Sequence, residues 1–364
     1  MIFILFAFIA FLYSLLIIWY GNGWKQTPHF QSEKIQHYAP LSIIIPYRNA
    51  NEAIKNILNY FESKKELEFE VLLINDFSEH IFDLSNEYSF PIQKLALQEF
   101  NTSLTPHKNN KKEAIDLGIS KSNFHYILCT DSDVIPSKKW LEGMMHFAQK
   151  HKPKFAAGIH RYLPQPSFLN YFLSLEQDNY TAISCAGIAQ EHPTMCNGAN
   201  MIFEKSAYYE IGGYEGLFHI NGGDDMLLLH RIQAKFPKNT HFIKSLETAV
   251  FSEAPKDFKS LFSQRKRWLS KSFDYENKWV GVQMFIALIA NLMVVFSIMI
   301  YFFQPLLFIF VLWKMLIDSA FLLSQQTFFN LKKNYVWFGL SLWLYPFYVL
   351  WLSFDFFKSK LFNK

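Results

Sequence analysis

Hydrophobic stretches without charges lie at both ends of the chain, and a part with ordinary globular patterning separates them. Residues 2–20 contain no charged side chain and are about long enough to cross ~30 Å of hydrocarbon. Three more stretches follow the middle part, at residues 279–303, 305–323 and 336–357. This pattern predicts a membrane anchor before a globular domain and about three spanning helices after it.

A signal peptide is the alternative interpretation of residues 2–20. No basic segment precedes this stretch, however, and no small-residue cleavage site follows it. Trp19, Tyr20 and Trp24 suit the aromatic belt of a membrane interface. We therefore expect an uncleaved anchor over residues 1–22, with a polar linker over residues 23–40.

The last two stretches contain a few charged residues. Lys314 and Asp318 lie four residues apart, on one face of a helix, where they can pair and lower the cost of insertion. Asp355 lies near the end of the third stretch. Residues 279–357 are thus expected to hold about three spanning helices.

Lysine and arginine residues predict the orientation in the membrane. The positive-inside rule places residues 21–278 and Lys332–Lys333 on the cytoplasmic side. Three lysines of the C-terminal tail, residues 358–364, would then lie outside, so the last segment lying along the interface is the alternative. We expect a multi-pass protein of a bacterial inner membrane with a cytoplasmic middle domain.

Short apolar runs alternate with segments of helical spacing in the middle part. The runs predict strands at residues 41–46, 69–74, 126–130 and 155–160. The helical segments are residues 52–61, 111–119, 138–150 and 168–190, and a weaker strand and helix are expected between residues 75 and 100. This alternation predicts a right-handed, parallel α/β sheet.

Acids or amides follow three of the predicted strands. Asp131 and Asp133 come directly after the apolar run that starts at Tyr126, and Asn49 and Asp76 follow two other strands. The carboxyl ends of parallel strands meet at one edge of a sheet, where α/β proteins bind nucleotides. Two carboxylates at such an edge suit Mg²⁺ or Mn²⁺, although a solvated turn is the alternative.

Further polar motifs follow in the second half of the domain. Small and amide residues at 196–200 suggest close approach of the backbone to a ligand, and Ser206 is expected to cap a short helix. Gly222 and Gly223 precede Asp224 and Asp225, two acids that open a helix and that either cap it or serve chemistry.

Residues 256–278 are basic and amphipathic at their start and contain the sequence Gln-Arg-Lys-Arg-Trp at 264–268. A cationic helix on the bilayer surface is the alternative interpretation of this segment. Because the overall net charge is only +4 with scattered basic residues, no nucleic-acid partner is suggested. The three cysteines have neither disulfide nor metal spacing, which favours a reduced compartment.

Four motifs in order carry a resemblance to the family 2 glycosyltransferases. They are Ile-Ile-Ile-Pro-Tyr-Arg-Asn at 43–49, Thr-Asp-Ser-Asp at 130–133, Gly-Asp-Asp at 223–225 and the Q-x-x-R-W form at 264–268. The chain is similar to the membrane-embedded group with cellulose synthase, hyaluronan synthase and ceramide glucosyltransferase. The resemblance implies a GT-A fold, a Rossmann-like mixed sheet at residues 41–255, and inverting transfer from a nucleotide sugar.

The resemblance also implies a role for each matching residue. Asp225 corresponds to the general base, with Asp224 beside it, and Asp131 and Asp133 correspond to the D-x-D acids that hold the diphosphate and Mg²⁺ or Mn²⁺. The implied nucleotide-sugar contacts are Pro46, Tyr47, Arg48, Asn49, Asp76, Lys111, Asp131, Gln264, Arg267 and Trp268. Ala50, Asn75 and Asp224 depart from the residues common in the family, and these departures concern the base contacts and the identity of the nucleotide more than the type of reaction.

Two classes of function are compatible with this sequence. The first is an enzyme that transfers a sugar, expected to come from a UDP-sugar, to a lipid or lipid-linked acceptor, with a processive polysaccharide synthase as its variant. The second is a membrane scaffold that only binds a nucleotide. Because all the motif acids are present, the enzyme is favoured, and the small number of C-terminal spans favours a lipid acceptor.

Overall fold

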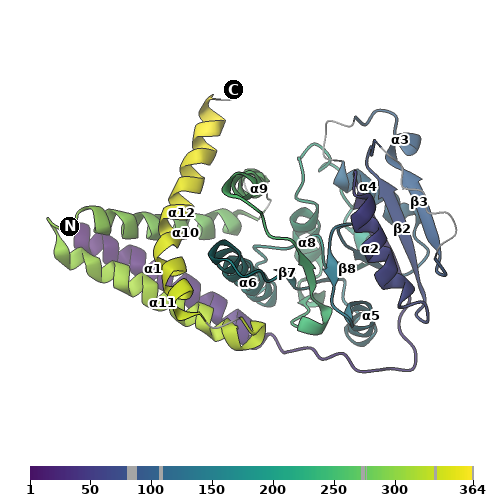
Figure 1. Ribbon diagram of the computed structural model, residues 1–364, viewed down its shortest axis with the longest axis horizontal. Coiled ribbons are helices and arrows are strands. Elements are labelled where there is room, and N and C mark those ends of the chain that lie inside the picture. Colours follow the sequence, from purple (N-terminus) through teal and green to yellow (C-terminus); the bar gives the residue numbers. More distant parts are fainter. Residues whose placement is uncertain (80–87, 106–109, 272–274, 276, 332–333, 363–364) are drawn as a thin grey trace. The chain divides into compact units, whose positions relative to one another are not determined.

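The computed structural model describes the chain of 364 residues except residues 80–87, 106–109, 272–274, 276, 332–333 and 363–364 (Figure 1). Its residues fall into two compact units. The helical unit comprises Met1–Gln26, Pro164–Gly187 and Ala254–Lys364, and the sheet unit comprises Thr27–Leu163 and Ile188–Glu253. The domain bounds expected from the sequence stay predictions.

The sheet unit is built around a seven-stranded sheet of order β3-β2-β1-β4-β8-β6-β9. Its strands are β1 (Leu41–Tyr47), β2 (Phe69–Asn75), β3 (Ile92–Ala96), β4 (Tyr126–Cys129), β6 (Phe155–Ala157), β8 (Met201–Glu204) and β9 (Thr240–Phe242). A three-stranded sheet of order β5-β10-β7 joins β5 (Ile135–Pro136), β7 (His160–Tyr162) and β10 (Val250–Ser252). The helices of this unit are α2 (Asn51–Glu62), α3 (Leu97–Phe100), α4 (Lys111–Lys121), α5 (Trp140–His151), α7 (Lys205–Glu210) and α8 (Asp224–Lys235), with 3-10 turns η1 (Pro237–Asn239) and η2 (Leu246–Thr248).

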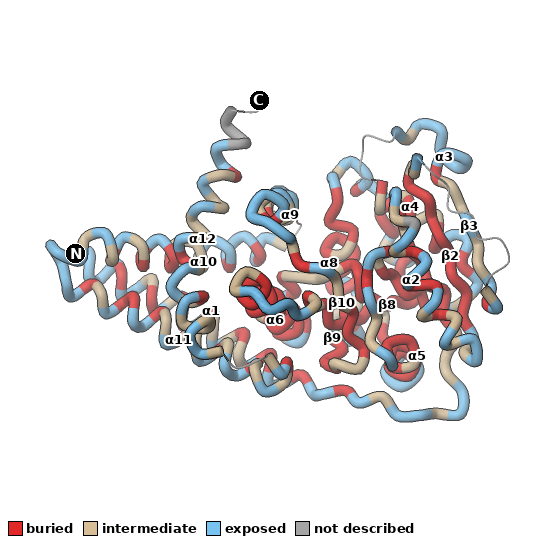
Figure 2. The backbone as a smooth tube through the Cα atoms, viewed as in Figure 1, coloured by how far each residue is buried: buried red, intermediate tan, exposed pale blue. Residues whose placement is uncertain are grey.

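The strands β1, β2 and β4 run parallel at the centre of the large sheet. Their apolar residues are almost completely buried, as expected for strands covered on both faces (Figure 2). The register pairs Tyr47 with Asn75 and Ile44 with Cys129, so the polar residues that follow these strands leave the sheet at the same edge. The predicted α/β architecture is thereby confirmed.

Two details of the predicted sheet were wrong. The sheet is mixed rather than wholly parallel, because β8 runs antiparallel to both β4 and β6. Residues 155–160 are not one strand: the backbone N–H of Gly158 donates to the carbonyl of Asn200, and the chain then leaves for β7 of the smaller sheet. The mixed sheet agrees with the family resemblance.

The predicted cap at Ser206 was also wrong. Helix α7 begins at Lys205, so Ser206 lies inside its first turn, and the N-cap position is Glu204. The Ser206 hydroxyl donates to the Glu204 carboxylate, whereas a capping hydroxyl would accept from a free backbone N–H group. The same carboxylate pairs with Lys154, and this local pairing competes with the capping geometry.

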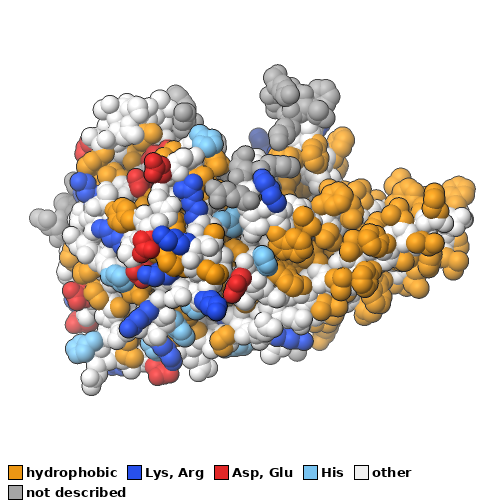
Figure 3. All heavy atoms as spheres, turned by 180° about the vertical axis from the view of Figure 1, so that it is seen from behind, with side chains coloured by type: hydrophobic (Ala, Val, Ile, Leu, Met, Phe, Trp, Pro, Cys, Tyr) orange, Lys and Arg blue, Asp and Glu red, His pale blue; other side chains and the backbone are white. Residues whose placement is uncertain are grey.

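Six helices form the described part of the helical unit. They are α1 (Ile2–Gln26), α6 (Phe168–Ala189), α9 (Phe258–Lys271), α10 (Lys278–Met299), α11 (Phe308–Phe329) and α12 (Tyr335–Phe362), with a 3-10 turn η3 (Pro305–Leu307) before α11. Segments at 2–26, 278–299, 305–329 and 335–358 are long and apolar enough to cross a membrane, which agrees with the four predicted spans. Figure 3 shows hydrophobic side chains gathered over the surface of these helices.

A polar network joins α1 to α11 inside this apolar bundle. Lys314 and Asp318 form the predicted pair, with 2.6 Å between the ammonium group and a carboxylate oxygen. The Tyr13 hydroxyl donates to the other Asp318 oxygen at 2.6 Å, a contact that the sequence did not indicate. The network satisfies charged groups in surroundings where an isolated charge is costly. The predicted contribution of Lys332–Lys333 to topology lies outside the described residues.

Asn200 links its own loop to α5, to η2 and to the segment between β6 and β7. Its side-chain nitrogen donates to the carbonyls of Ile159 and Thr248 at 2.9 and 2.8 Å, and its oxygen accepts from the indole of Trp140 at 3.0 Å. Asn200 is completely buried, so none of these groups has access to bulk water. The backbone carbonyl of Asn200 also accepts from Gly158.

We predict that Asn200→Ala lowers the free energy of unfolding by roughly 2–4 kcal/mol, because it leaves buried partners without a hydrogen bond. Thermal unfolding of the purified protein in detergent would measure the change. Asn239→Ala is the matched control, since Asn239 is exposed. Equal melting temperatures for the two variants would contradict the assigned role of Asn200.

Candidate functional site

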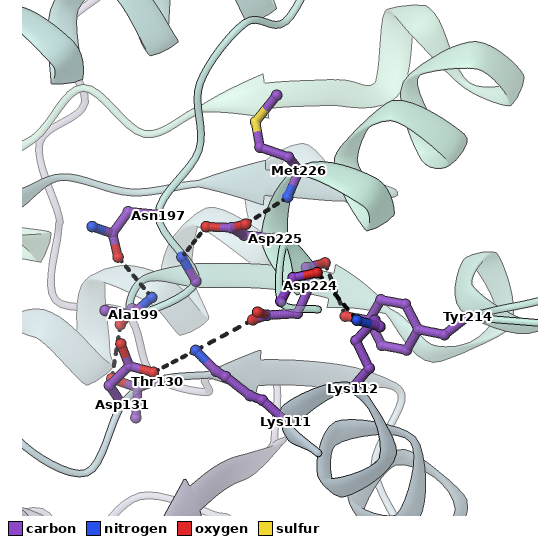
Figure 4. Close-up of polar contacts among 12 residues, drawn as sticks. Lys111, Lys112, Thr130, Asp131, Asn197, Ala199, Tyr214, Asp224, Asp225 and Met226 are labelled. Atoms are coloured by element: carbon purple, nitrogen blue, oxygen red, sulfur yellow. Dashed lines mark hydrogen bonds and ion pairs between the residues drawn. The ribbon is translucent and has the colours of Figure 1, made fainter. Parts of the chain in front are cut away.

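Lys111 begins helix α4 and lies against two acids from different elements (Figure 4). Its ammonium nitrogen is 2.6 Å from an oxygen of Asp131, which follows β4, and 3.2 Å from an oxygen of Asp224, which begins α8. Burial by itself lowers the pKa of Lys111, but the charges of Asp131 and Asp224 outweigh burial and hold this pKa well above its ordinary value. Lys111 is therefore a fixed cation between two carboxylates.

Asp224 and Asp225 begin α8, as predicted, but their side chains have different surroundings. The side chain of Asp224 is 7% exposed and pairs with Lys111, while the Tyr214 hydroxyl donates to its backbone carbonyl at 3.0 Å. Asp225 is half-buried, and one of its oxygens accepts from the backbone N–H of Met226 at 2.8 Å. Asp225 thus helps to cap α8, whereas Asp224 is engaged by a cation.

The turn before these acids and the loop at 196–200 fix their position. Gly222 and Gly223 have φ angles of +77° and +72°, a conformation that side chains with a Cβ rarely adopt. The backbone N–H of Gly198 donates to Asp225 at 3.1 Å. The Thr130 hydroxyl donates to the carbonyl of Ala199 at 2.8 Å, which ties the loop to the end of β4 (Figure 4). The loop thus brings its backbone against Asp225, and the expected close approach to a ligand stays a prediction.

Asp133 lies two residues beyond Asp131 and is exposed at the surface. Nearby protein atoms and the negative charge of Asp131 nevertheless raise the pKa of Asp133. Two carboxylates this close in the sequence form a donor set that suits a hard divalent cation. The residues present therefore fit Mg²⁺ or Mn²⁺, although no cluster of three or more potential ligands occurs among the described residues.

The ends of β1 and β2 form a second part of the edge. Asp76 is largely buried and accepts from the side-chain nitrogen of Asn110 at 2.9 Å, and its backbone N–H donates to the carbonyl of Tyr47. Pro46 and Tyr47 close β1, and Arg48 and Asn49 follow it. The Asn49 side chain accepts from the backbone N–H of Glu79 at 2.9 Å, which links the two strand ends.

The remaining predicted residues, Gln264, Arg267 and Trp268, lie on α9 of the helical unit. Arg267 is exposed, and Gln264 and Trp268 are half-buried. The structure therefore brings Lys111, Asp131, Asp224 and Asp225 together in the sheet unit. The α9 residues belong to the helical unit.

Residues 42–212 match the family model described as Glycosyl transferase family 2. This stretch, slightly less than half of the chain, is a family 2 glycosyltransferase domain. The protein is therefore an enzyme. No curated protein sequence matches the chain.

The chain is also similar to solved structures. A mannosyltransferase from Pyrobaculum calidifontis in complex with GDP-Man and Mn²⁺ is 14% identical, with a TM-score of 0.53, over 89% of this chain and 96% of that one. TarS residues 1–349 from S. aureus are 14% identical over 68% of this chain and 69% of that one, with a TM-score of 0.38. The mannosyltransferase confirms the GT-A fold expected from the motifs.

Sequence reasoning missed two residues of this glycosyltransferase that support the site. Lys112 is 1% exposed, and its ammonium group donates to the carbonyls of Ile220 and Gly222, in the turn that leads to the acids. Asn110 orients Asp76. The only sequence signal for Lys112 was its position next to Lys111, and its burial was not evident from the sequence.

We predict that Gly198→Ala lowers the turnover of the glycosyltransferase by roughly tenfold or more, because displaced acids lose productive geometry. A Cβ at this position would lie 3.0 Å from an Asp224 oxygen and 3.3 Å from the Lys111 nitrogen. Release of nucleoside diphosphate measures turnover. Gly21→Ala is the control, because a Cβ there meets nothing within 4 Å. Wild-type turnover in Gly198→Ala would show that the site tolerates this shift.

Proposed function

We propose that this enzyme transfers a sugar, with inversion at the anomeric carbon, from a nucleotide sugar to a lipid or lipid-linked acceptor at the cytoplasmic face of a membrane. A UDP-sugar is the expected donor. The observation that carries the proposal is the position of Lys111 between Asp131 and Asp224, in a chain with four helices apolar enough to span a membrane.

The sheet edge offers the groups that a nucleotide sugar requires. Asp76, held by Asn110, accepts a hydrogen bond from the base, and the end of β1 from Pro46 to Asn49 lies beside it. Lys111 binds the diphosphate as a point charge, and Arg267 is an exposed cation that supplements it. Charge that develops on the leaving diphosphate is stabilised by these two side chains.

Asp131 and Asp133 would hold Mg²⁺ or Mn²⁺. Such a cation, when bound, neutralises charge on the diphosphate of the donor. Support comes from the two carboxylates at one strand end and from the mannosyltransferase of the same fold, whose structure is a complex with GDP-Man and Mn²⁺. The nucleotide in that structure contains guanine, whereas the donor proposed here contains uracil, so the identity of the base has to be determined by experiment.

Asp225 is proposed as the general base that takes the proton of the acceptor hydroxyl. Asp224 is less suited, because its carboxylate is buried and paired with Lys111. Asp225 is half-buried and accepts from the backbone N–H groups of Gly198 and Met226, which orient its carboxylate. A carboxylate held in this way can reach an acceptor hydroxyl at hydrogen-bond distance.

The apolar helices favour an acceptor that meets the bilayer. Gln264 and Trp268 of α9 are proposed to contact the nucleotide and the acceptor near the membrane face. Three C-terminal helices are few for a polysaccharide conduit, which favours a lipid acceptor over processive synthesis. The multi-pass arrangement with a cytoplasmic catalytic domain follows from the distribution of basic residues.

A donor panel tests the proposed function. Purified protein in vesicles that contain bacterial lipids is incubated with UDP- and GDP-sugars, and both nucleoside diphosphate and glycosylated lipid are measured. A single sugar on a lipid supports the proposal. A long glycan product would establish the processive alternative, and donor consumption without any acceptor product would refute transfer to lipid.

Removal of the metal-binding acid should abolish this activity. We predict that Asp133→Ala lowers turnover by roughly 10²-fold or more and abolishes the dependence of nucleoside diphosphate affinity on Mn²⁺. Calorimetric titration with and without Mn²⁺ measures the second effect. Glu68→Ala, at an exposed acid, is the control. Full wild-type turnover in excess chelator would contradict the metal requirement.

Asp225→Asn separates catalysis from helix capping. Asparagine caps a helix about as well as aspartate, but it cannot take a proton, so turnover should fall by roughly 10²–10⁴-fold while nucleoside diphosphate binding is retained. Turnover and calorimetric binding are measured on the same preparation. Near-normal turnover would contradict the assignment of Asp225 as the general base and leave Asp224 as the candidate. Loss of binding together with a lower melting temperature would favour a purely structural role.

A further inference from the structure

The three basic residues at 265–267 have different surroundings in the helical unit. The side chain of Arg265 is 2% exposed and pairs with Glu176 of α6, whose side chain is 1% exposed, at 2.5 Å. Lys266 pairs with Asp355 of α12 at 2.5 Å, and both of these side chains are about one-third exposed. Arg267 is exposed. Three consecutive residues of α9 therefore differ in burial and in their partners.

Arg265 contacts both half-buried members of the Q-x-x-R-W motif. One guanidinium nitrogen donates to the side-chain oxygen of Gln264 at 2.7 Å. The guanidinium carbon lies 4.2 Å from the centre of the Trp268 ring, within the range of a cation–π contact. Arg265 is thus bound to the two side chains proposed to contact the substrates, although it occupies a variable position of the motif.

Glu176 fixes the other side of Arg265. Its second oxygen accepts from the Tyr180 hydroxyl at 2.7 Å, and the Tyr180 ring lies 6.3 Å from the Trp268 ring, at an angle of 66°. Both carboxylate oxygens are therefore occupied by groups of this cluster. The cluster consists of Glu176, Tyr180, Gln264, Arg265 and Trp268.

A buried ion pair is weak support for stability, because well-packed apolar residues of similar volume often stabilise a protein as well. Arginine differs from such residues in its planar fork, which can bond a carboxylate and an amide and stack on an indole at the same time. The geometry of Arg265 uses all three properties. The buried pair is thus better explained by orientation than by stability.

We propose that Arg265 and Glu176 are positioning residues, which hold Gln264 and Trp268 in the orientation that binds substrate and leave Arg267 to meet the diphosphate. This inference rests on the proposed function, because it assumes that Gln264 and Trp268 contact substrate. Arg265 acts through these neighbours and does not touch the reacting atoms.

The test uses an apolar double variant, Glu176→Leu with Arg265→Met, which removes both charges and approximately keeps the volume. Its melting temperature should stay close to that of the wild type, while kcat/KM falls roughly 10–100-fold, because the substrate contacts lose their orientation. If the double variant loses both activity and melting temperature, a second variant, Arg265→Lys, separates positioning from stability. This variant keeps the charge but loses the planar fork, so it should retain the fold and lose activity.

Lys266→Met is the matched control, since it removes a neighbouring basic residue whose ion pair is partly exposed. It should keep kcat/KM within about twofold. The loss caused by Arg265→Lys should also largely disappear in a Trp268→Ala, Gln264→Ala background, because residues that act as a unit are not additive. Full additivity, or wild-type kcat/KM in the folded double variant, would overturn the proposal.

A second readout does not depend on activity. The emission of Trp268 is obtained by subtracting the spectrum of each protein's Trp268→Phe counterpart, and its quenching by acrylamide is measured. Quenching should increase in the apolar double variant and in Arg265→Lys but not in Lys266→Met. Unchanged quenching in both would overturn the positioning role. If the wild type transfers no sugar from any donor, the proposed function fails, while the quenching comparison still decides whether Arg265 holds Trp268.

Discussion

The ion pairs of Lys111 hold the candidate active site together. Two acids from separate elements, Asp131 after β4 and Asp224 at the start of α8, would repel each other without an intervening cation. Lys111 is placed there by the first turn of α4, whose residues also pack beneath β1 and β2. The site therefore depends on the order of the central strands, because only that order brings the three elements to one edge.

Backbone groups also fix the positions of Asp224 and Asp225. Gly198 donates to Asp225, and its Cα lies so close to Asp224 and Lys111 that a side chain would displace them. Lys112 holds the carbonyls of the preceding turn from inside the fold. The position of the acids is thus fixed by contacts to rigid backbone on both sides, as catalytic geometry requires.

Periodicity and motifs predicted the central strands, the four apolar helices and the residues around Lys111, because buried strands and spanning helices have strong local patterns. The antiparallel direction of β8 was not predictable in this way, since direction is set by pairing with β4 and β6 over long distances in the sequence. The break at Gly158 depends on Asn200, forty-two residues later by sequence number. The roles of Asn110 and Lys112 likewise arise from tertiary contacts that no local pattern encodes.

Basic residues one or two positions apart have different surroundings in both units. Neighbouring positions on a helix point about 100° apart, so one side chain can face a ligand while the next one enters the protein. Lys111 faces the acids and Lys112 is buried beneath their turn, while Arg267 is exposed and Arg265 is buried against Glu176. A motif that records only Lys111 or Arg267 therefore omits the buried basic residue nearby, which contacts other members of the proposed site.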